Sequence, residues 1–194
     1  MLRLTIVFTA LIFVSFFSQA SAEENHYSQF WREDQTVFSN DRIKLSLNSL
    51  VSHTFNKNWG AFGFLGVNKE YAHAYFGPTF SMDDWLQCGI GIGIEQDKRP
   101  LHGGTFVFLN DDQATLLVVG EYGGSGYWYK TELMVKTGTW FSPGIMIQRF
   151  MGIGLRMQIN IPETPIEIWG GPFYDWEEDG AAAFKGLLGV RLNF

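Results

Sequence analysis

The chain has 194 residues, a net charge of −6 at pH 7 and one cysteine, Cys88. Because binding to nucleic-acid phosphates needs a basic face, the acidic balance argues against a nucleic-acid partner. One cysteine excludes an intramolecular disulfide, so an exported form of the chain must depend on packing or on a lipid solvent. The length is sufficient for a single domain with its own core or a closed barrel.

Residues 1–22 have the pattern of an export signal. Arg3 supplies a positive charge, Ile6–Phe17 form an apolar run, and Ala20–Ala22 form a small-residue cleavage site. The apolar run is short for a membrane span of about 20 residues, so an N-terminal anchor helix is the weaker alternative. The sequence therefore predicts export with a cleaved signal peptide.

Residues 23–41 are predicted to be a leader that precedes the main domain. On a helical projection, Tyr27, Phe30, Trp31 and Phe38 fall near one side, which is typical of a short amphipathic helix at a membrane surface or a barrel end. A flexible leader is the alternative.

From residue 42 to Phe194 the hydrophobic pattern has a period of two, which indicates β-strands. The alternation is clearest in Trp85–Gln96 and in Met151–Ile161, where apolar residues alternate with glycine and polar residues. Several segments have about 9–11 residues, the length that a tilted transmembrane strand needs. No apolar run after the signal is long enough for a spanning helix.

The best count is ten strands, or eight if the weakest pair is merged. Trp140–Phe150 is ambiguous and is interpreted as a loop with some strand character, because counting it gives eleven strands and bacterial single-chain barrels have an even number. The predicted fold is therefore all-β: an antiparallel up-and-down transmembrane β-barrel of 8–10 strands over residues 42–194, preceded by the short helix.

The composition of the two strand faces indicates which face meets lipid. A soluble barrel points its apolar face inward, whereas a membrane barrel points it outward. Here the other face is rich in glycine, which weakens a solvated strand, and carries charges of both signs, which can pair in a narrow lumen. We therefore expect the apolar face to meet lipid; a soluble β-sandwich or barrel is the alternative. The predicted polar network of the lumen comprises Glu95, Glu121, Lys130, Glu132, Arg156 and Arg191.

The last strand continues its alternation to Phe194, the final residue. With the export signal and the strand pattern, this ending resembles small bacterial outer-membrane β-barrel proteins as a broad class. The resemblance implies the outer membrane of a Gram-negative bacterium as the location, and Phe194 as the assembly signal. It implies outer-membrane lipid and lipopolysaccharide, the barrel-assembly machinery and an envelope protein as partners.

The stretch from Trp59 to Leu101 resembles part of the lipid A palmitoyltransferase family, an eight-stranded barrel preceded by an amphipathic helix. The resemblance implies catalytic candidates at His53 and Asp83. The family's serine position carries Asp84, so the hydroxyl that would take part in acyl transfer is missing.

The sequence predicts no cofactor and no metal site, because its four histidines have no metal-ligand spacing. A small barrel with a lumen filled by side chains suggests a structural or interaction role in the cell envelope. A lipid A-modifying enzyme and a narrow pore of low conductance are the alternatives.

Overall fold

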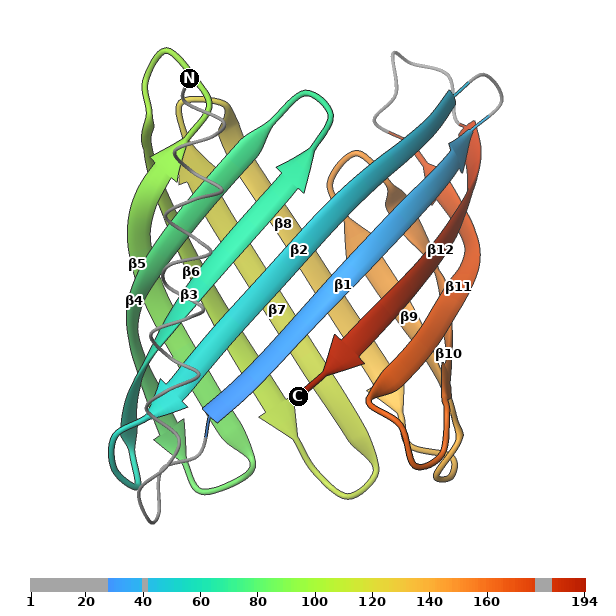
Figure 1. The fold of residues 1–194 in the computed structure, drawn as a ribbon. Coiled ribbons are helices and arrows are strands. Elements are labelled where there is room, and N and C mark those ends of the chain that lie inside the picture. The colour runs from blue at the N-terminus through green and yellow to red at the C-terminus, as the bar shows by residue number, and fades with distance from the viewer. Residues whose placement is uncertain (1–27, 40–41, 177–182) are drawn as a thin grey trace.

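The computed structural model describes residues 28–39, 42–176 and 183–194. In these residues twelve antiparallel strands close into one barrel (Figure 1). The strands are β1 (Ser28–Ser39), β2 (Arg42–Thr54), β3 (Trp59–Asn68), β4 (Ala72–Met82), β5 (Leu86–Glu95), β6 (Leu101–Asn110), β7 (Ala114–Gly123), β8 (Gly126–Val135), β9 (Phe141–Gln148), β10 (Gly152–Asn160), β11 (Ile166–Asp175) and β12 (Ala183–Asn193). No helix in the described part of the chain is long and apolar enough to cross a membrane.

Each strand pairs with the next along the chain, and β12 pairs with β1 to close the barrel. At this seam Trp31 lies opposite Asn193, and Phe38 lies opposite Gly186. Two backbone hydrogen bonds join Phe30 and Phe194, with N···O distances of 3.0 and 2.8 Å. The regular end of β12 therefore removes the free edge that an open sheet would expose.

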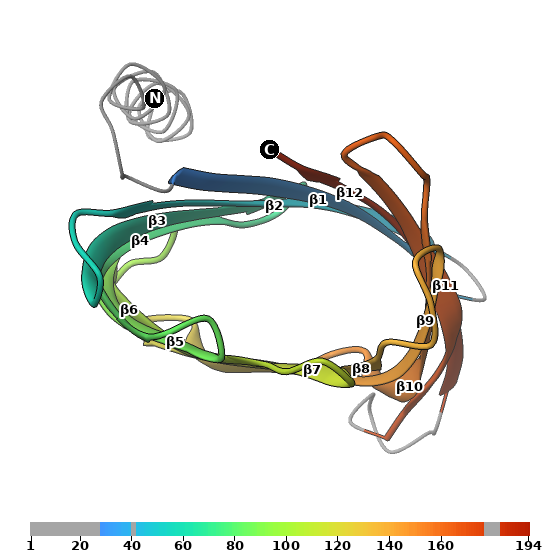
Figure 2. The same ribbon diagram turned by 90° about the horizontal axis from the view of Figure 1, so that it is seen from below.

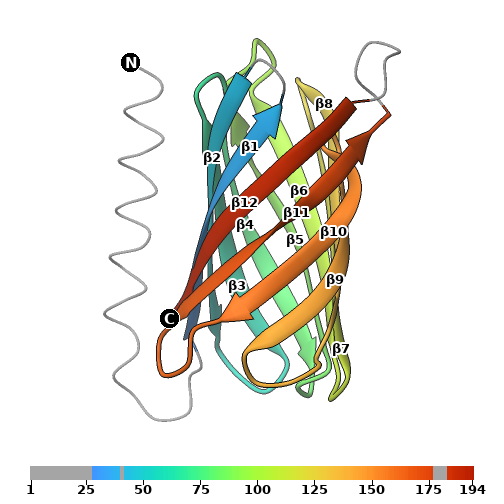
Figure 3. The same ribbon diagram turned by 90° about the vertical axis from the view of Figure 1, so that its right-hand side faces the viewer.

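The barrel is elongated in cross-section, with β1 and β8 on its two long sides (Figure 2). We call the end where β1 begins and β12 ends the lower end, and the opposite end the upper end. The strands cross between the two ends at a marked tilt (Figure 3).

Side-chain exposure shows that the apolar face points outward. The side chains of Ile90, Ile92 and Leu155 are 68%, 59% and 51% exposed, whereas Glu95 and Arg156 are 0% exposed. Polar residues thus occupy the interior and large apolar residues the surface, the arrangement of a barrel surrounded by lipid.

A charged pair interrupts this apolar surface on β1. Arg32 and Asp34 point outward, with 3.1 Å between Arg32 Nη2 and Asp34 Oδ2, and both side chains are nearly half exposed. Asp34 lies opposite Leu47 of β2 and Val190 of β12, near the middle of β1. The outer face of β1 therefore does not follow the pattern of its neighbours.

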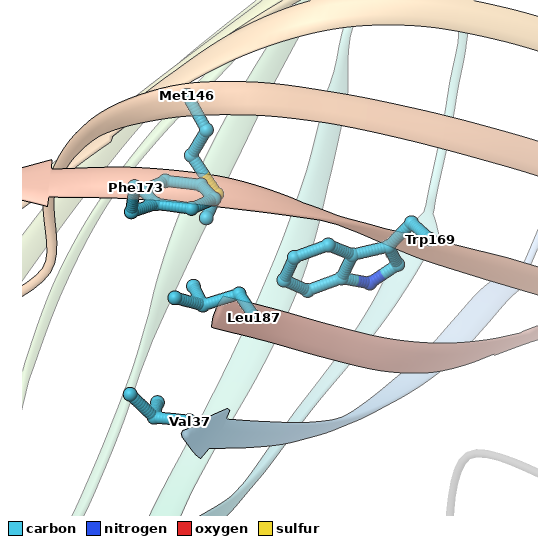
Figure 4. Close-up of a cluster of buried hydrophobic side chains, with 5 residues drawn as sticks. All are labelled: Val37, Met146, Trp169, Phe173 and Leu187. Carbon is cyan, nitrogen blue, oxygen red and sulfur yellow. The ribbon is translucent and has the colours of Figure 1, made fainter. Parts of the chain in front are cut away.

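Two apolar clusters occupy parts of the lumen. The first consists of Val37, Met146, Trp169, Phe173 and Leu187, whose side chains face one another between β1, β9, β11 and β12 (Figure 4). The second consists of Phe62, Tyr75 and Phe106 from β3, β4 and β6, with ring centroids 5.0 Å apart for the two phenylalanines. Both clusters fill part of the lumen with side chains.

The prediction of an all-β antiparallel closed barrel is confirmed, but the count of ten strands is wrong. The predicted helix is wrong over Ser28–Ser39, which forms β1 and pairs with β2 and β12. The inner positions of β1 are Trp31, Glu33, Gln35 and Val37, which follow a period of two. The hydrophobic pattern does not show this period, because charged side chains occupy outward positions.

The second missed strand is β9, which lies inside the segment interpreted as a loop. Pro143 and Gly144 weaken its strand pattern, since proline cannot donate a ladder hydrogen bond and glycine favours other conformations. The predicted signal peptide at 1–22, the start of the leader at 23–27 and residues 177–182 lie outside the described residues.

Candidate functional site

Five charged residues, four of them buried and Arg191 partly buried, meet at mid-height in the lumen, and we call them the central network. They are Glu33 of β1, Lys130 and Glu132 of β8, Arg156 of β10 and Arg191 of β12. Lys130 Nζ lies 3.0 Å from Glu33 Oε1 and 2.6 Å from Glu132 Oε1. Arg156 reaches the same two carboxylates, at 3.1 Å from Nη2 to Glu33 Oε2 and 3.0 Å from Nη1 to Glu132 Oε1.

The central network crosses the lumen. The barrel order places four strands between β1 and β8 on one side and six on the other. Glu33 and Lys130 therefore extend from opposite walls, as the positions of β1 and β8 in Figure 2 make clear. Their ion pair ties together two strands that share no backbone hydrogen bonds.

The charges of the central network are balanced once the neighbouring Glu167 is included. Arg191 contacts Glu33, lies 3.4 Å from Glu132, and reaches Glu167 of β11 at 3.9 Å. With Glu167 included, three cations face three carboxylates. Arg156 also stacks on the ring of Trp169, with its guanidinium carbon 3.9 Å from the ring centroid. This charge pairing offsets part of the desolvation cost of the buried charges, although Arg156 Nε, Arg191 Nε and Glu167 Oε2 make no hydrogen bond within the described part of the chain.

A cavity of about 500 Å³ lies beside the network. On β8 it is lined by the successive inward residues Trp128, Lys130, Glu132 and Met134, and by Lys136 just past the strand. One wall is largely aromatic and aliphatic, with Phe64, Tyr75, Phe106, Phe108, Leu117 and Val119. The other wall carries amide and charged groups, including Gln158, Asn160, Glu167, Arg191 and Asn193.

A second polar group, which we call the upper cluster, lies near the upper end. Its members are His73 of β4, Glu95 of β5, His102 of β6 and Glu121 of β7. His102 Nδ1 lies 2.9 Å from Glu95 Oε2, and the Nε2 atoms of His102 and His73 lie 3.4 and 3.2 Å from Glu121 Oε2. The cluster thus places two imidazole rings against two buried carboxylates.

Neutral hydroxyl and amide donors surround the upper cluster. The Tyr71 hydroxyl donates to Glu95, and the backbone N–H and hydroxyl of Ser125 donate to the same carboxylate at 2.7 Å each. Burial and the hydrogen bond to Glu95 raise the pKa of Tyr71, which therefore stays protonated. The Tyr75 hydroxyl donates to Glu121 Oε1 at 2.9 Å.

The six residues of the predicted polar network divide between these two groups. Lys130, Glu132, Arg156 and Arg191 meet in the central network, whereas Glu95 and Glu121 lie in the upper cluster. Sequence reasoning missed Glu33, because β1 was interpreted as a helix. It also missed His73 and His102. Both occupy the alternate positions of their strands that carry polar residues, and this position was the signal that could have identified them.

The structure places the catalytic candidates near the lower end. His53, on β2, is buried and its ring lies 5.3 Å from that of Phe55. Asp83, in the turn after β4, forms an exposed ion pair with Lys57 at 3.1 Å. The backbone oxygen of Asp84 accepts a hydrogen bond from Asn110 at 3.3 Å. Phe194 lies at the β1–β12 seam described above.

No protein-family model matches the sequence, and no curated protein matches it. Among solved structures the chain is similar to the KdgM porin, with a TM-score of 0.54 and 9% identity over 84% of this chain and 99% of that one. A structure of the KdgM porin in complex with disordered oligogalacturonate gives the same values. The NanC porin has a TM-score of 0.53 and 10% identity over 83% of this chain and 98% of that one.

At these identities the similarity concerns the fold alone. It supports the broad class predicted from the sequence and does not show the resemblance to lipid A palmitoyltransferases. The chain therefore has the transmembrane β-barrel fold of outer-membrane porins.

Proposed function

We propose that this chain is exported to the outer membrane and forms a narrow pore for small polar solutes, restricted at mid-height by the central network. The observation that carries this proposal is the cavity along β8. Its lining includes each inward position from Trp128, near the upper end, to Lys136, just beyond the lower end of the strand. A cavity with this lining follows the direction that a solute would take across the barrel.

The character of the cavity walls supports passage of polar solutes with an apolar face. Aromatic rings on one side offer contacts to apolar surface, and amides and charges on the other replace the hydrogen bonds that a solute gives up on leaving water. The KdgM and NanC structures are those of porins, and the proposal takes from them only the type of barrel.

The central network supplies the restriction. Glu33 and Arg156 are fully buried, and the Glu33–Lys130 pair extends across the short dimension of the lumen. A solute that passes mid-height must move beside these paired side chains, so we expect a low conductance.

Planar-bilayer recording of the purified barrel tests the proposal. Glu33→Ala with Lys130→Ala removes one carboxylate and one ammonium group, so the charge balance of the network is kept while both spanning side chains are shortened. We expect small channels from the unaltered protein and a several-fold larger single-channel conductance from the double variant.

The matched control is Lys57→Ala with Asp83→Ala, which removes an exposed ion pair outside the lumen. It is expected to leave the conductance unchanged. Heat-modifiable gel mobility shows that each variant is folded. If folded barrels of both the unaltered chain and the Glu33/Lys130 variant fail to conduct, the pore proposal is wrong.

The second candidate is a structural or interaction role in the envelope. The two apolar clusters and the ion pairs of the central network favour it, because both fill the lumen with permanent contacts. Absence of conductance in the recordings above is the outcome that this candidate requires.

A further inference from the structure

We propose that His73, His102 and Glu121 form a binding site for a divalent transition-metal ion with the ligand preferences of Zn²⁺. One ligand atom from each residue lies within 4.8 Å of the others. Imidazole and carboxylate are ligands that Zn²⁺ takes readily, and two histidines with one carboxylate leave a fourth position for water. Mg²⁺ and Ca²⁺ fit less well, because they prefer oxygen ligands throughout.

Two of the three ligand–ligand distances match the edge of such a site. Glu121 Oε2 lies 3.2 Å from His73 Nε2 and 3.4 Å from His102 Nε2. With metal–ligand bonds of 2.0–2.1 Å, the edge of a tetrahedral site is about 3.3 Å. The ligand nitrogens of His73 and His102 lie within 4.8 Å of each other, so an ion bound to all three atoms would draw the two rings toward that spacing.

The Nε2 atoms of His73 and His102 lie close to Glu121 Oε2 but form no aligned hydrogen bond with it. Nε2 of His102 and both ring nitrogens of His73 are buried without one in the described structure, and His102 is only 2% exposed. If His102 donates its Nδ1 proton to Glu95, a neutral ring directs the Nε2 lone pair at the Glu121 carboxylate. That arrangement is unfavourable unless a proton or a metal ion lies between them.

A bound dication would balance the charge of the cluster. Within the described residues, neither Glu95 nor Glu121 forms an ion pair with a lysine or arginine; their ionic partners are histidines. Two carboxylates and two neutral imidazoles carry a net charge of about −2, and burial makes that charge costly. Protonating both rings would instead place two cations with ring centroids 5.0 Å apart.

The surrounding groups are those that support a metal ligand. Metal-bound histidines usually donate their other ring nitrogen to a carboxylate or carbonyl, which fixes the ring orientation. Glu95 fills this role for His102, and Ser125 and Tyr71 hold Glu95 in place. Tyr75 occupies Glu121 Oε1 and leaves Oε2 directed toward the two rings.

Titration of Zn²⁺ into the purified, tag-free barrel tests the assignment by calorimetry. The unaltered protein is expected to bind one Zn²⁺ per chain. His73→Gln and His102→Gln each remove a ligand and are expected to lower the affinity by more than 100-fold. Glu95→Gln leaves the ligands in place and is expected to weaken binding by 10–100-fold.

His53→Gln is the matched control, because it replaces a buried histidine of β2 outside the cluster. It is expected to leave Zn²⁺ affinity unchanged. The proposal is overturned if His73→Gln and His102→Gln, folded as judged by heat-modifiable mobility, bind Zn²⁺ as the unaltered protein does.

A second measurement needs no variant. X-ray absorption at the zinc edge of the loaded, unaltered protein reports the ligands directly. Two imidazoles with oxygen ligands in the first coordination shell support the site. A shell with fewer imidazoles, or no bound zinc after gel filtration, contradicts it.

Discussion

The central network and the upper cluster each bury two carboxylates in the same lumen, and they differ in the groups that compensate them. In the central network, lysine and arginine supply positive charge at every physiological pH, and the carboxylates of Glu33 and Glu132 each contact several cations. In the upper cluster, the carboxylates face histidines and neutral donors. The charge there is compensated only when a proton or a metal ion is bound.

This difference suggests separate tasks for the two groups. A permanently paired network that joins β1 to β8, β10 and β12 behaves as a fixed structural element, since its strength does not depend on a ligand. A cluster with unpartnered ring nitrogens responds to its surroundings. Stability measurements on variants of each group should therefore distinguish the two.

The largest effect is expected from Arg156→Met. This change keeps most of the side-chain volume but leaves the buried Glu33 and Glu132 with one cation fewer and removes the stacking on Trp169. Breaking a buried ion pair from one side typically destabilises a protein by about 3–5 kcal/mol. Urea unfolding in lipid vesicles measures the loss. Lys57→Met, which breaks an exposed pair, is the control and is expected to lower the free energy of unfolding by about 0–1 kcal/mol. Equal losses for the two variants would contradict a structural role for the network.

A smaller effect is expected from Gly189→Ala in β12. A Cβ atom at this position would overlap the indole ring of Trp169, which is 1% exposed and lies beneath Arg156. Overpacking of this kind costs about 1–3 kcal/mol. Gly186→Ala in the same strand is the control, because its nearest atom would be 3.8 Å away, and a change within about 0.5 kcal/mol is expected. The same unfolding assay compares them, and a neutral Gly189→Ala would show that Trp169 is free to move.

In the upper cluster, Gly123→Ala is expected to destabilise the metal-free barrel by about 1 kcal/mol. The added Cβ would lie 2.6 Å from the Glu95 carboxylate and would displace it from Ser125 and His102. The hydrogen bonds lost in this way typically contribute about 1 kcal/mol each to the free energy of unfolding. Gly120→Ala, with its nearest atom 3.8 Å away, is the control. Repeating both measurements with Zn²⁺ sharpens the comparison: the metal should stabilise Gly120→Ala more than Gly123→Ala. Equal stabilisation of the two variants would show that Glu95 does not support the metal site.

The sequence predicted the barrel because strands such as β5 alternate cleanly. Ile90, Ile92 and Ile94 face outward between inward glycines, so the sequence reveals both the period of two and the outward direction of the apolar face. It failed at β1, where Arg32 and Asp34 occupy outward positions and the apolar face is lost. It failed at β9, where Pro143 and Gly144 interrupt the pattern.

The members of the lumen network were predictable from parity, but their partners were not. Glu33 and Lys130 are 97 residues apart, and their contact depends on how register accumulates across several strand pairs. The same holds for His73, His102 and Glu121, which come from three strands and follow no ligand spacing in the chain. A barrel brings such residues together through its closure and tilt, neither of which is encoded locally.

The smallest effect is expected from Asp111→Asn, in the turn between β6 and β7, where an exposed carboxylate serves as a reference for the buried ones. Hydrogen bonds from the backbone amides of Ala114 and Gln113, each 2.7 Å long, lower the pKa of Asp111. A lowered pKa means that the folded chain favours the ionised form, so this stabilisation is present at neutral pH and is lost as the pH falls below the usual aspartate range. The urea midpoint of Asp111→Asn should therefore lie slightly below that of the unaltered protein at pH 7 and should approach it near pH 3. Asp112→Asn controls for the loss of one negative charge in the same turn. The opposite outcome is a difference between Asp111→Asn and the unaltered protein that is the same at both pH values. It would mean that the amide hydrogen bonds do not depend on the carboxylate charge, because the neutral asparagine oxygen accepts them as well.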